Sequence, residues 1–175
     1  MARIEPIPLE RAEGRARVLL DELVAHGGEP GPMTLAMANA PALLRGYLDL
    51  SRAMKRTHID RRVVERINLA VHATLECDYC IAAHTRAARG LGVPESEIRL
   101  ARHWTSADPA IAAMVAFARR VLVSPRDIAD EDLERLHAHG YDDEQIAEVP
   151  GLVAQQVLTG AFNLIAGIHA PAGPE

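Results

Sequence analysis

The sequence predicts an all-α protein. Of its 175 residues, 30 are Ala and 19 are Leu, which favour helices, and only six are aromatic. Apolar residues recur at helical spacing, and no alternation of apolar and polar residues extends beyond a few positions. A chain of this length suggests a single domain, residues 1–175, that buries a substantial core of its own. We expect a bundle of about seven or eight helices joined by short loops.

Helical spacing and chain-breaking residues divide the N-terminal half. After an extended lead-in over residues 1–8, the pattern predicts a helix over 9–26, which a run of Gly and Pro ends. A short helix is expected over 34–38. Pro41 suits the first turn of the next helix, and Asp60 is a candidate N-cap for the helix that follows it.

The C-terminal half repeats this pattern of starts and stops. Further helices are expected over 81–91, after Pro94, over 108–123, over 130–139, and in a long last segment. Asp142 can cap that last helix, within which Pro150 and Gly151 should introduce a kink or a break. Residues 170–175 should form a loose tail.

Charge and hydropathy exclude several classes of protein. The net charge is −5, and the 18 Arg and one Lys are spread along the chain, so we expect neither nucleic acid nor a membrane as partner. Residues 149–168 carry no charge but are too polar and too interrupted for a membrane span. Residues 1–17 lack the apolar region of a signal peptide. We therefore expect a cytoplasmic protein, in which a structural disulfide is not expected.

The chain has two cysteines, Cys77 and Cys80, in the arrangement Cys-x-x-Cys. In a cytoplasmic protein this spacing indicates redox chemistry or metal binding. His84 follows Cys80 by four positions, so the two side chains share a face of a helix. The start of that helix stabilises a thiolate, the form of cysteine that attacks peroxides and disulfides. His84 can accept the thiol proton or pair with the thiolate.

A turn near Glu76 would place further polar groups opposite the cysteines. If the chain folds back there as an antiparallel pair of helices, Glu65 lies opposite residue 87, within one helical turn of His84. The same folding sets His72 opposite the second cysteine. Among the residues that precede the cysteines, we therefore expect Glu65 first and His72 second to take part in the site. Residues 65–84 are the candidate redox segment.

The pattern Glu-x(11)-Cys-x-x-Cys-x-x-x-His, formed by Glu65, Cys77, Cys80 and His84, resembles the alkyl hydroperoxidase D-like group of the carboxymuconolactone decarboxylase family. The resemblance extends over roughly residues 33–169. It implies an all-helical, usually homo-oligomeric thiol peroxidase or disulfide reductase, and we expect no cofactor and no metal.

The resemblance also implies roles for the residues that match. Cys80 would be the peroxidatic cysteine and form a sulfenic acid, which Cys77 would resolve as a disulfide. Glu65 and His84 would form the proton relay. The substrate would be hydrogen peroxide or a small organic peroxide, and a lipoyl group or a thioredoxin-like dithiol protein would reduce the disulfide. Decarboxylases of the wider family typically lack this cysteine pair, so lactone decarboxylation is disfavoured.

One position departs from the resemblance. The best-studied peroxidase of this type has a second histidine immediately before its second cysteine, and that position is Tyr79 in this sequence. The relay is therefore incomplete, which leaves strong peroxidase turnover an open question. His72 is the candidate substitute.

The same residues allow other interpretations. Cys77, Cys80, His84 and Glu65 can be four zinc ligands, although the second, separated ligand pair of structural zinc sites is missing. The chain would then be a non-enzymatic metal-binding or redox-sensing module. The cysteines can instead be small buried apolar residues, Glu65 a solvated helix residue, and His72 a packed or surface histidine. Ala-rich and Met-containing helices offer flat apolar faces, so we expect a homo-oligomer.

Overall fold

The computed structural model describes residues 2–169, and every regular element within them is helical. The α-helices are α1 (Gly14–Ala25), α2 (Pro32–Met37), α3 (Pro41–Met54), α4 (Arg61–Thr74), α5 (Asp78–Gly90), α6 (Glu95–Ala101), α7 (Pro109–Val123), α8 (Asp130–Ala138) and α9 (Asp143–Ala166). Two short 3-10 helices, η1 (Leu9–Arg11) and η2 (Pro125–Asp127), accompany them. The all-α prediction is confirmed, and the described residues contain nine α-helices where about seven or eight were expected. The predicted tail, residues 170–175, lies outside the described residues.

The first helix begins later than its spacing predicts. Instead of one helix over 9–26, the chain forms η1, an extended residue at Ala12, and then α1 from Gly14. Gly14 has a φ of +55°, which glycine adopts without steric strain but which interrupts a right-handed helix. The break therefore falls where a glycine permits it.

Aspartate side chains begin three of the helices. Asp60 accepts a hydrogen bond from the backbone N–H of Arg62 at the start of α4, and Asp142 accepts one from Gln145 at the start of α9. Both caps are as predicted. Asp108 caps α7 in the same way. Each cap satisfies backbone N–H groups that have no partner inside the helix, and so defines where the helix starts.

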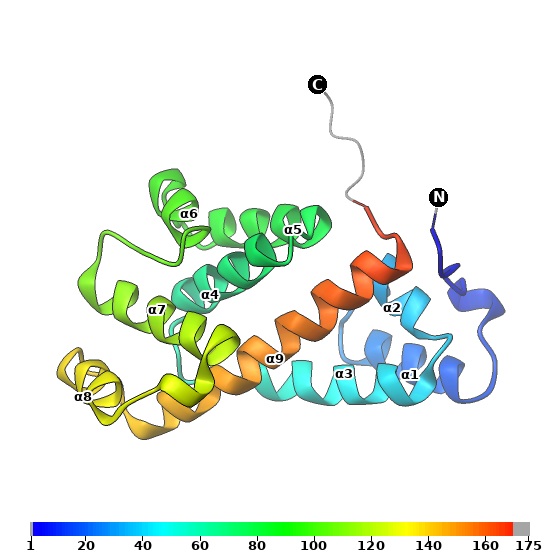
Figure 1. The fold of residues 1–175 in the computed structure, drawn as a ribbon. Coiled ribbons are helices and arrows are strands. Elements are labelled where there is room, and N and C mark those ends of the chain that lie inside the picture. The colour runs from blue at the N-terminus through cyan, green and yellow to red at the C-terminus, as the bar shows by residue number, and fades with distance from the viewer. Residues whose placement is uncertain (1, 170–175) are drawn as a thin grey trace.

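Helix α9 runs unbroken for 24 residues and crosses the middle of the molecule (Figure 1). The expected break at Pro150 and Gly151 is absent. Pro150 removes one backbone hydrogen bond, and packing of the helix against its neighbours stabilises it across that gap. A Cβ on Gly151 would lie 2.8 Å from Sδ of Met54, so Gly151 allows the end of α3 to pack closely on α9.

By length and composition, α9 would also pass as a membrane-crossing helix, which its polar residues did not lead us to expect. The core helix of a soluble protein passes the same test, and 44% of its apolar window is buried inside the protein. It packs against α3, α4 and α7. The core therefore accounts for part of the apolar surface of α9, whereas Leu164 and Ile165 near its end are exposed.

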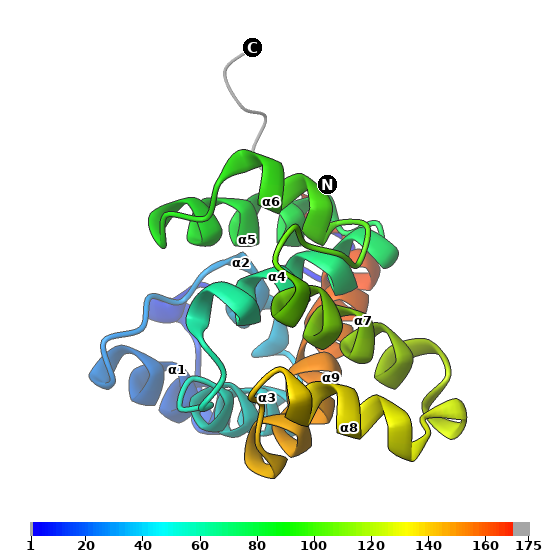
Figure 2. The ribbon, with the colours of Figure 1, turned by 90° about the vertical axis from the view of Figure 1, so that its left-hand side faces the viewer.

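The main core lies where α4, α7 and α9 meet (Figure 2). Its fully buried side chains include Ile67, Val71, Met114, Val115 and Leu152. A second cluster joins α1, α2 and α3. Helix α4 is buried continuously from residue 63 to residue 72, so any polar side chain in that stretch must find a partner inside the protein.

The chain turns back between α4 and α5, at the predicted position. Glu76 has a φ of +56°, which is uncommon for a residue other than glycine, and the N–H of Cys77 donates to the C=O of His72 at 3.1 Å. Helix α5 then runs back along α4 (Figure 1). This hairpin brings the cysteines against the buried polar residues of α4.

Candidate active site

The two cysteines lie at the start of α5 and are joined by a disulfide. Cys77 is the N-cap of the helix and Cys80 lies in its first turn. The two residues are only 1% and 4% exposed, respectively. The positive end of the helix dipole therefore acts on both sulfurs and favours a thiolate when the disulfide is reduced, which offsets part of the cost of burying that charge.

Asn163 of α9 reaches the second cysteine from the opposite side. Its Nδ2 donates to Sγ of Cys80 at 3.2 Å, in a contact that is buried. Sequence reasoning did not propose a role for this residue. The sequence shows only that a polar side chain interrupts a largely apolar helix. Helical spacing cannot predict a contact with a residue 83 positions away along the chain.

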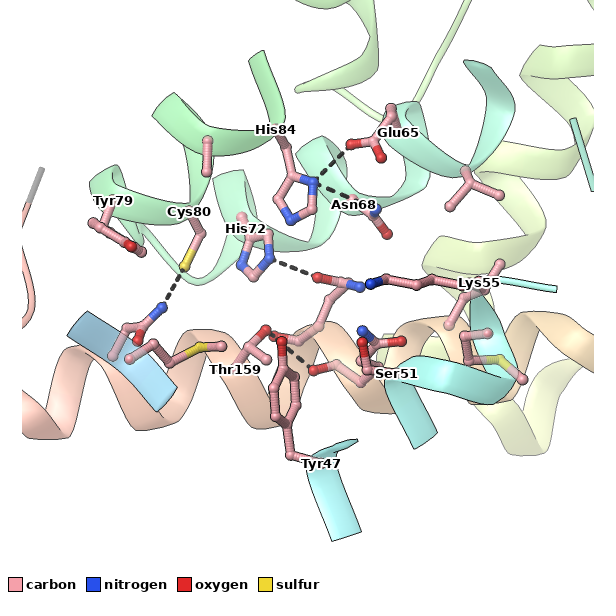
Figure 3. A pocket seen from close by; sticks show the side chains of 18 of the residues that line it. Tyr47, Ser51, Lys55, Glu65, Asn68, His72, Tyr79, Cys80, His84 and Thr159 are labelled. Atoms are coloured by element: carbon pink, nitrogen blue, oxygen red, sulfur yellow. Dashed lines mark hydrogen bonds and ion pairs between the residues drawn. The ribbon is translucent and has the colours of Figure 1, made fainter. Parts of the chain in front are cut away.

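Glu65 and His84 are in contact, as the predicted hairpin requires. Oε2 of the buried Glu65 lies 2.7 Å from Nδ1 of His84. A carboxylate can only accept hydrogen bonds, and this distance is that of a hydrogen bond. Nδ1 of His84 therefore carries the proton and donates the hydrogen bond to Glu65. The other ring nitrogen, Nε2, is then free to act as a base, and Figure 3 shows it on the side of the cavity.

His72 is stacked on His84. The ring centroids are 5.0 Å apart and the planes differ by 17°. Nε2 of His72 lies 2.9 Å from Oε1 of Gln156, which only accepts, so Nε2 carries the proton. Burial, and secondarily the neighbouring His84, lower the pKa of His72 to about 4. The ring is therefore neutral near pH 7, with a lone pair on Nδ1.

The histidine next to the sulfur atoms is His72. One of its ring nitrogens and the sulfurs of Cys77 and Cys80 all lie within 4.8 Å of one another, and His84 is not part of this group. The predicted hairpin set His72 opposite Cys80, and this is confirmed: Glu65 and His84 form one pair, and His72 lies between that pair and the cysteines. The ring atom of His72 that faces Cys80 in Figure 3 is the nitrogen not bonded to Gln156.

The four zinc ligands considered from sequence do not come together. Within residues 2–169, the potential metal-binding group that contains the cysteines has His72 as its third member, in place of Glu65 and His84. Glu65 is occupied by His84 and lies 3.7 Å from the guanidinium of Arg61. That ligand set is therefore wrong for this structure.

A cavity of about 230 Å³ lies between α3, α4, α5 and α9 (Figure 3). Cys80, His72, His84 and Glu65 all line it, whereas Cys77 does not. This volume is smaller than that of pockets for drug-sized ligands, so the cavity suits a molecule of only a few non-hydrogen atoms. Tyr79, the residue that departs from the resemblance, forms part of its wall.

Polar groups line this cavity on several sides. Lys55 and Arg61 are exposed and contribute positive charge, while Tyr47 contributes a phenol whose pKa is raised by burial. Oδ1 of Asn68, Oδ1 of Asn163 and Nδ1 of His72 are buried and have no hydrogen-bond partner among the described residues. These three acceptors are available to a bound molecule that donates hydrogen bonds.

The chain matches known proteins in sequence and in fold. The model of the carboxymuconolactone decarboxylase family matches residues 41–129, which include the whole cysteine motif. The uncharacterized protein YdfG of Bacillus subtilis (strain 168) is 28% identical over 120 residues, 66% of this chain and 81% of that protein.

Two solved structures share the fold across almost the whole chain. An uncharacterized peroxidase-related protein from Ralstonia eutropha JMP134, described as an alkylhydroperoxidase AhpD core, gives a TM-score of 0.82 at 21% identity and covers 98% of this chain and 93% of its own. The debrominase Bmp8 gives a TM-score of 0.75 at 20% identity, with coverages of 97% and 92%.

The helical arrangement, with a cysteine pair at the α4–α5 hairpin, is the AhpD-like fold. The chain belongs to the carboxymuconolactone decarboxylase family.

Proposed function

We propose that this protein is a thiol-dependent peroxidase or disulfide reductase that reduces hydrogen peroxide or small organic peroxides through Cys77 and Cys80. The observation that carries the proposal is the buried cysteine pair, closed as a disulfide at one end of a small cavity, with a Glu65–His84 pair and a second imidazole beside it.

Cys80 is the proposed nucleophile because it lines the cavity and Cys77 does not. Its thiolate attacks one peroxide oxygen, the O–O bond breaks, and the leaving alkoxide or hydroxide takes a proton. The product at Cys80 is a sulfenic acid. The N–H of Asn163 and the start of α5 both favour the thiolate that begins this step.

Cys77 then attacks the sulfur of the sulfenic acid, forming the disulfide and releasing water. An external dithiol reduces this disulfide and is itself oxidised to a disulfide, which restores both thiols. The proposed reductant is a lipoyl group or a thioredoxin-like dithiol protein.

The proposed proton path begins at His84, whose Nδ1–H is held by Glu65 and whose Nε2 is free to accept a proton. His72 supplies a second imidazole from α4. It replaces the second histidine of the resembled peroxidase, whose position is taken by Tyr79 in this chain. Its neutral ring and free Nδ1 suit it to accept a hydrogen bond from a cysteine thiol.

Compartment and assembly are part of the same proposal. A disulfide that must be reduced after each turnover suits the cytoplasm, where thiols are kept reduced. The exposed apolar side chains of Leu164 and Ile165, near the end of α9, are a candidate contact surface for a homo-oligomer.

Steady-state peroxide consumption with a panel of reductants tests the function. The panel would contain a dihydrolipoyl compound, thioredoxin and dithiothreitol, each assayed with the wild type, Cys80→Ser and Cys77→Ser. We expect multiple turnovers for the wild type and a loss of at least about 100-fold for Cys80→Ser. Disulfide formation without multiple turnovers, for every reductant, would instead favour the redox-sensing alternative.

A further inference from the structure

We propose that reduction of the Cys77–Cys80 disulfide creates a zinc site whose protein ligands are the two thiolates and His72. One ring nitrogen of His72 and the two sulfurs already lie within 4.8 Å of one another. Tetrahedral zinc, with Zn–S of about 2.3 Å and Zn–N of about 2.0–2.1 Å, holds such ligands about 3.5–3.8 Å apart. Reduction frees the sulfurs to separate to this spacing.

The donor set selects the kind of metal. Two thiolates and one imidazole are the ligands that zinc prefers, whereas magnesium and calcium require oxygen. Three protein ligands leave one position open for water or for a molecule in the cavity that Cys80 lines. All three residues are buried, so the site is shielded from bulk solvent.

His72 is held in the orientation that a metal ligand needs. Its Nε2–H donates to Oε1 of Gln156 at 2.9 Å, which fixes the tautomer and leaves the lone pair on Nδ1. Nδ1 is buried and has no partner within residues 2–169. Gly160 of α9 keeps this nitrogen open, because a Cβ there would come within 3.1 Å of it. The unpartnered nitrogen is the independent observation that points to a ligand.

Formation of the site requires a reductant and zinc, and no other reactant. A dithiol or phosphine reductant transfers two electrons to the disulfide, giving two cysteine thiols. Zinc binding then displaces one proton from each thiol, so that the site gains a dication and releases two protons. In the oxidised protein the sulfur lone pairs remain, but the thiolates do not exist and the site is closed.

Zinc bound here would occupy the electron pair with which Cys80 attacks peroxide. It would therefore be a reversible inhibitor of the reduced enzyme, an effect that rests on the proposed function. The binding site itself rests only on the position of the three ligands.

The test uses the full-length protein, reduced with a phosphine and freed of reductant, and titrated with Co²⁺ as a spectroscopic probe of the site. We expect one Co²⁺ per chain, with thiolate-to-metal charge-transfer absorption that stoichiometric Zn²⁺ abolishes. The oxidised protein should give no such absorption. Reduced wild-type protein that binds no Co²⁺ would overturn the site, and this comparison requires no variant to fold.

Two histidine variants identify the nitrogen ligand. His72→Gln should weaken Co²⁺ binding by at least about tenfold, whereas the matched variant His84→Gln should change it by less than about threefold. An equal loss in both variants would contradict the ligand assignment.

Peroxide turnover measured on the same preparations separates this inference from the proposed function. Zinc should stop turnover of the reduced wild type, and a chelator should restore it. Turnover that continues while the site is filled with Zn²⁺ overturns the inhibitory role. Co²⁺ binding by a protein without turnover in any reductant contradicts only the proposed function, and turnover without Co²⁺ binding contradicts only the zinc site.

Discussion

His72 and His84 stack with their ring centroids 5.0 Å apart, although they belong to different helices and have different hydrogen-bond partners. Glu65 holds one ring and Gln156 holds the other, so their free nitrogens are Nε2 of His84 and Nδ1 of His72. The two imidazoles lie between a buried carboxylate and the cysteine pair.

The Glu65–His84 pair should control turnover more than folding. Glu65→Gln removes the carboxylate that orients His84, and we expect the kcat/KM for peroxide to fall about 10²-fold or more. The matched control is Asp132→Asn, which breaks the ion pair of Asp132 with Arg120, two residues that do not line the cavity. This variant should lose stability but retain turnover. Comparable kinetic losses in both variants would remove the basis for a specific role of Glu65.

Asn163 should activate Cys80. Asn163→Leu keeps a side chain of similar size but removes the N–H that donates to the sulfur. In the reduced protein with Cys77→Ser as background, alkylation of Cys80 by iodoacetamide at pH 7 should slow severalfold, because less of the cysteine is thiolate. An unchanged alkylation rate, with the fold intact by circular dichroism, would show that this contact does not activate the sulfur.

His72 should make the stability of the oxidised protein depend on pH. Its pKa is lowered to about 4 in the folded protein, whereas the unfolded chain binds a proton near the ordinary value of 6.5. The unfolded state therefore holds more protons between these values, and stability that is complete above pH 6.5 is lost as the pH falls toward 4. We expect this loss to reach up to about 3 kcal/mol.

Urea denaturation of the chelator-treated, oxidised protein between pH 4 and pH 8 measures this effect. His72→Gln, which does not titrate, should flatten the profile. An identical slope in both proteins would mean that other groups account for the acid sensitivity.

Two glycines in helices should respond to alanine in opposite ways. A Cβ on Gly160 would lie 2.6 Å from Cδ1 of Leu75 and 3.1 Å from Nδ1 of His72, so Gly160→Ala should cost about 1–3 kcal/mol of stability. A Cβ on Gly46 would meet no atom of another segment within 4 Å, so Gly46→Ala should stabilise α3 by about 0.5–1 kcal/mol. Thermal unfolding of the two variants checks both signs, and a neutral Gly160→Ala would indicate that α9 and α4 are not packed so closely.

Local signals in the sequence were sufficient for much of the fold. The caps at Asp60 and Asp142 are side-chain contacts over two or three residues, so the local sequence is enough to predict them. The reversal at Glu76 is a condition of the predicted hairpin, and the structure meets it. The Glu65–His84 contact then follows from the geometry of that hairpin.

The features that sequence reasoning missed depend on packing between distant segments. Gln156 and Asn163 reach the site from α9, more than 80 residues away, and nothing in their local pattern indicates this. The continuity of α9 through Pro150 likewise depends on burial by neighbouring helices. The position of His72 opposite Cys80, by contrast, follows from the predicted hairpin and is confirmed, whereas its stacking on His84 depends on how α4 and α5 cross.

A single-turnover titration tests the central claim most directly. Reduced wild-type protein would be mixed with substoichiometric hydroperoxide, and the remaining peroxide and free thiols counted. The account predicts that two thiols are lost for each peroxide consumed, that Cys77 and Cys80 are recovered as a disulfide, and that Cys80→Ser consumes none. Peroxide consumption by Cys80→Ser at the wild-type rate, or thiols that persist while peroxide disappears, would contradict it.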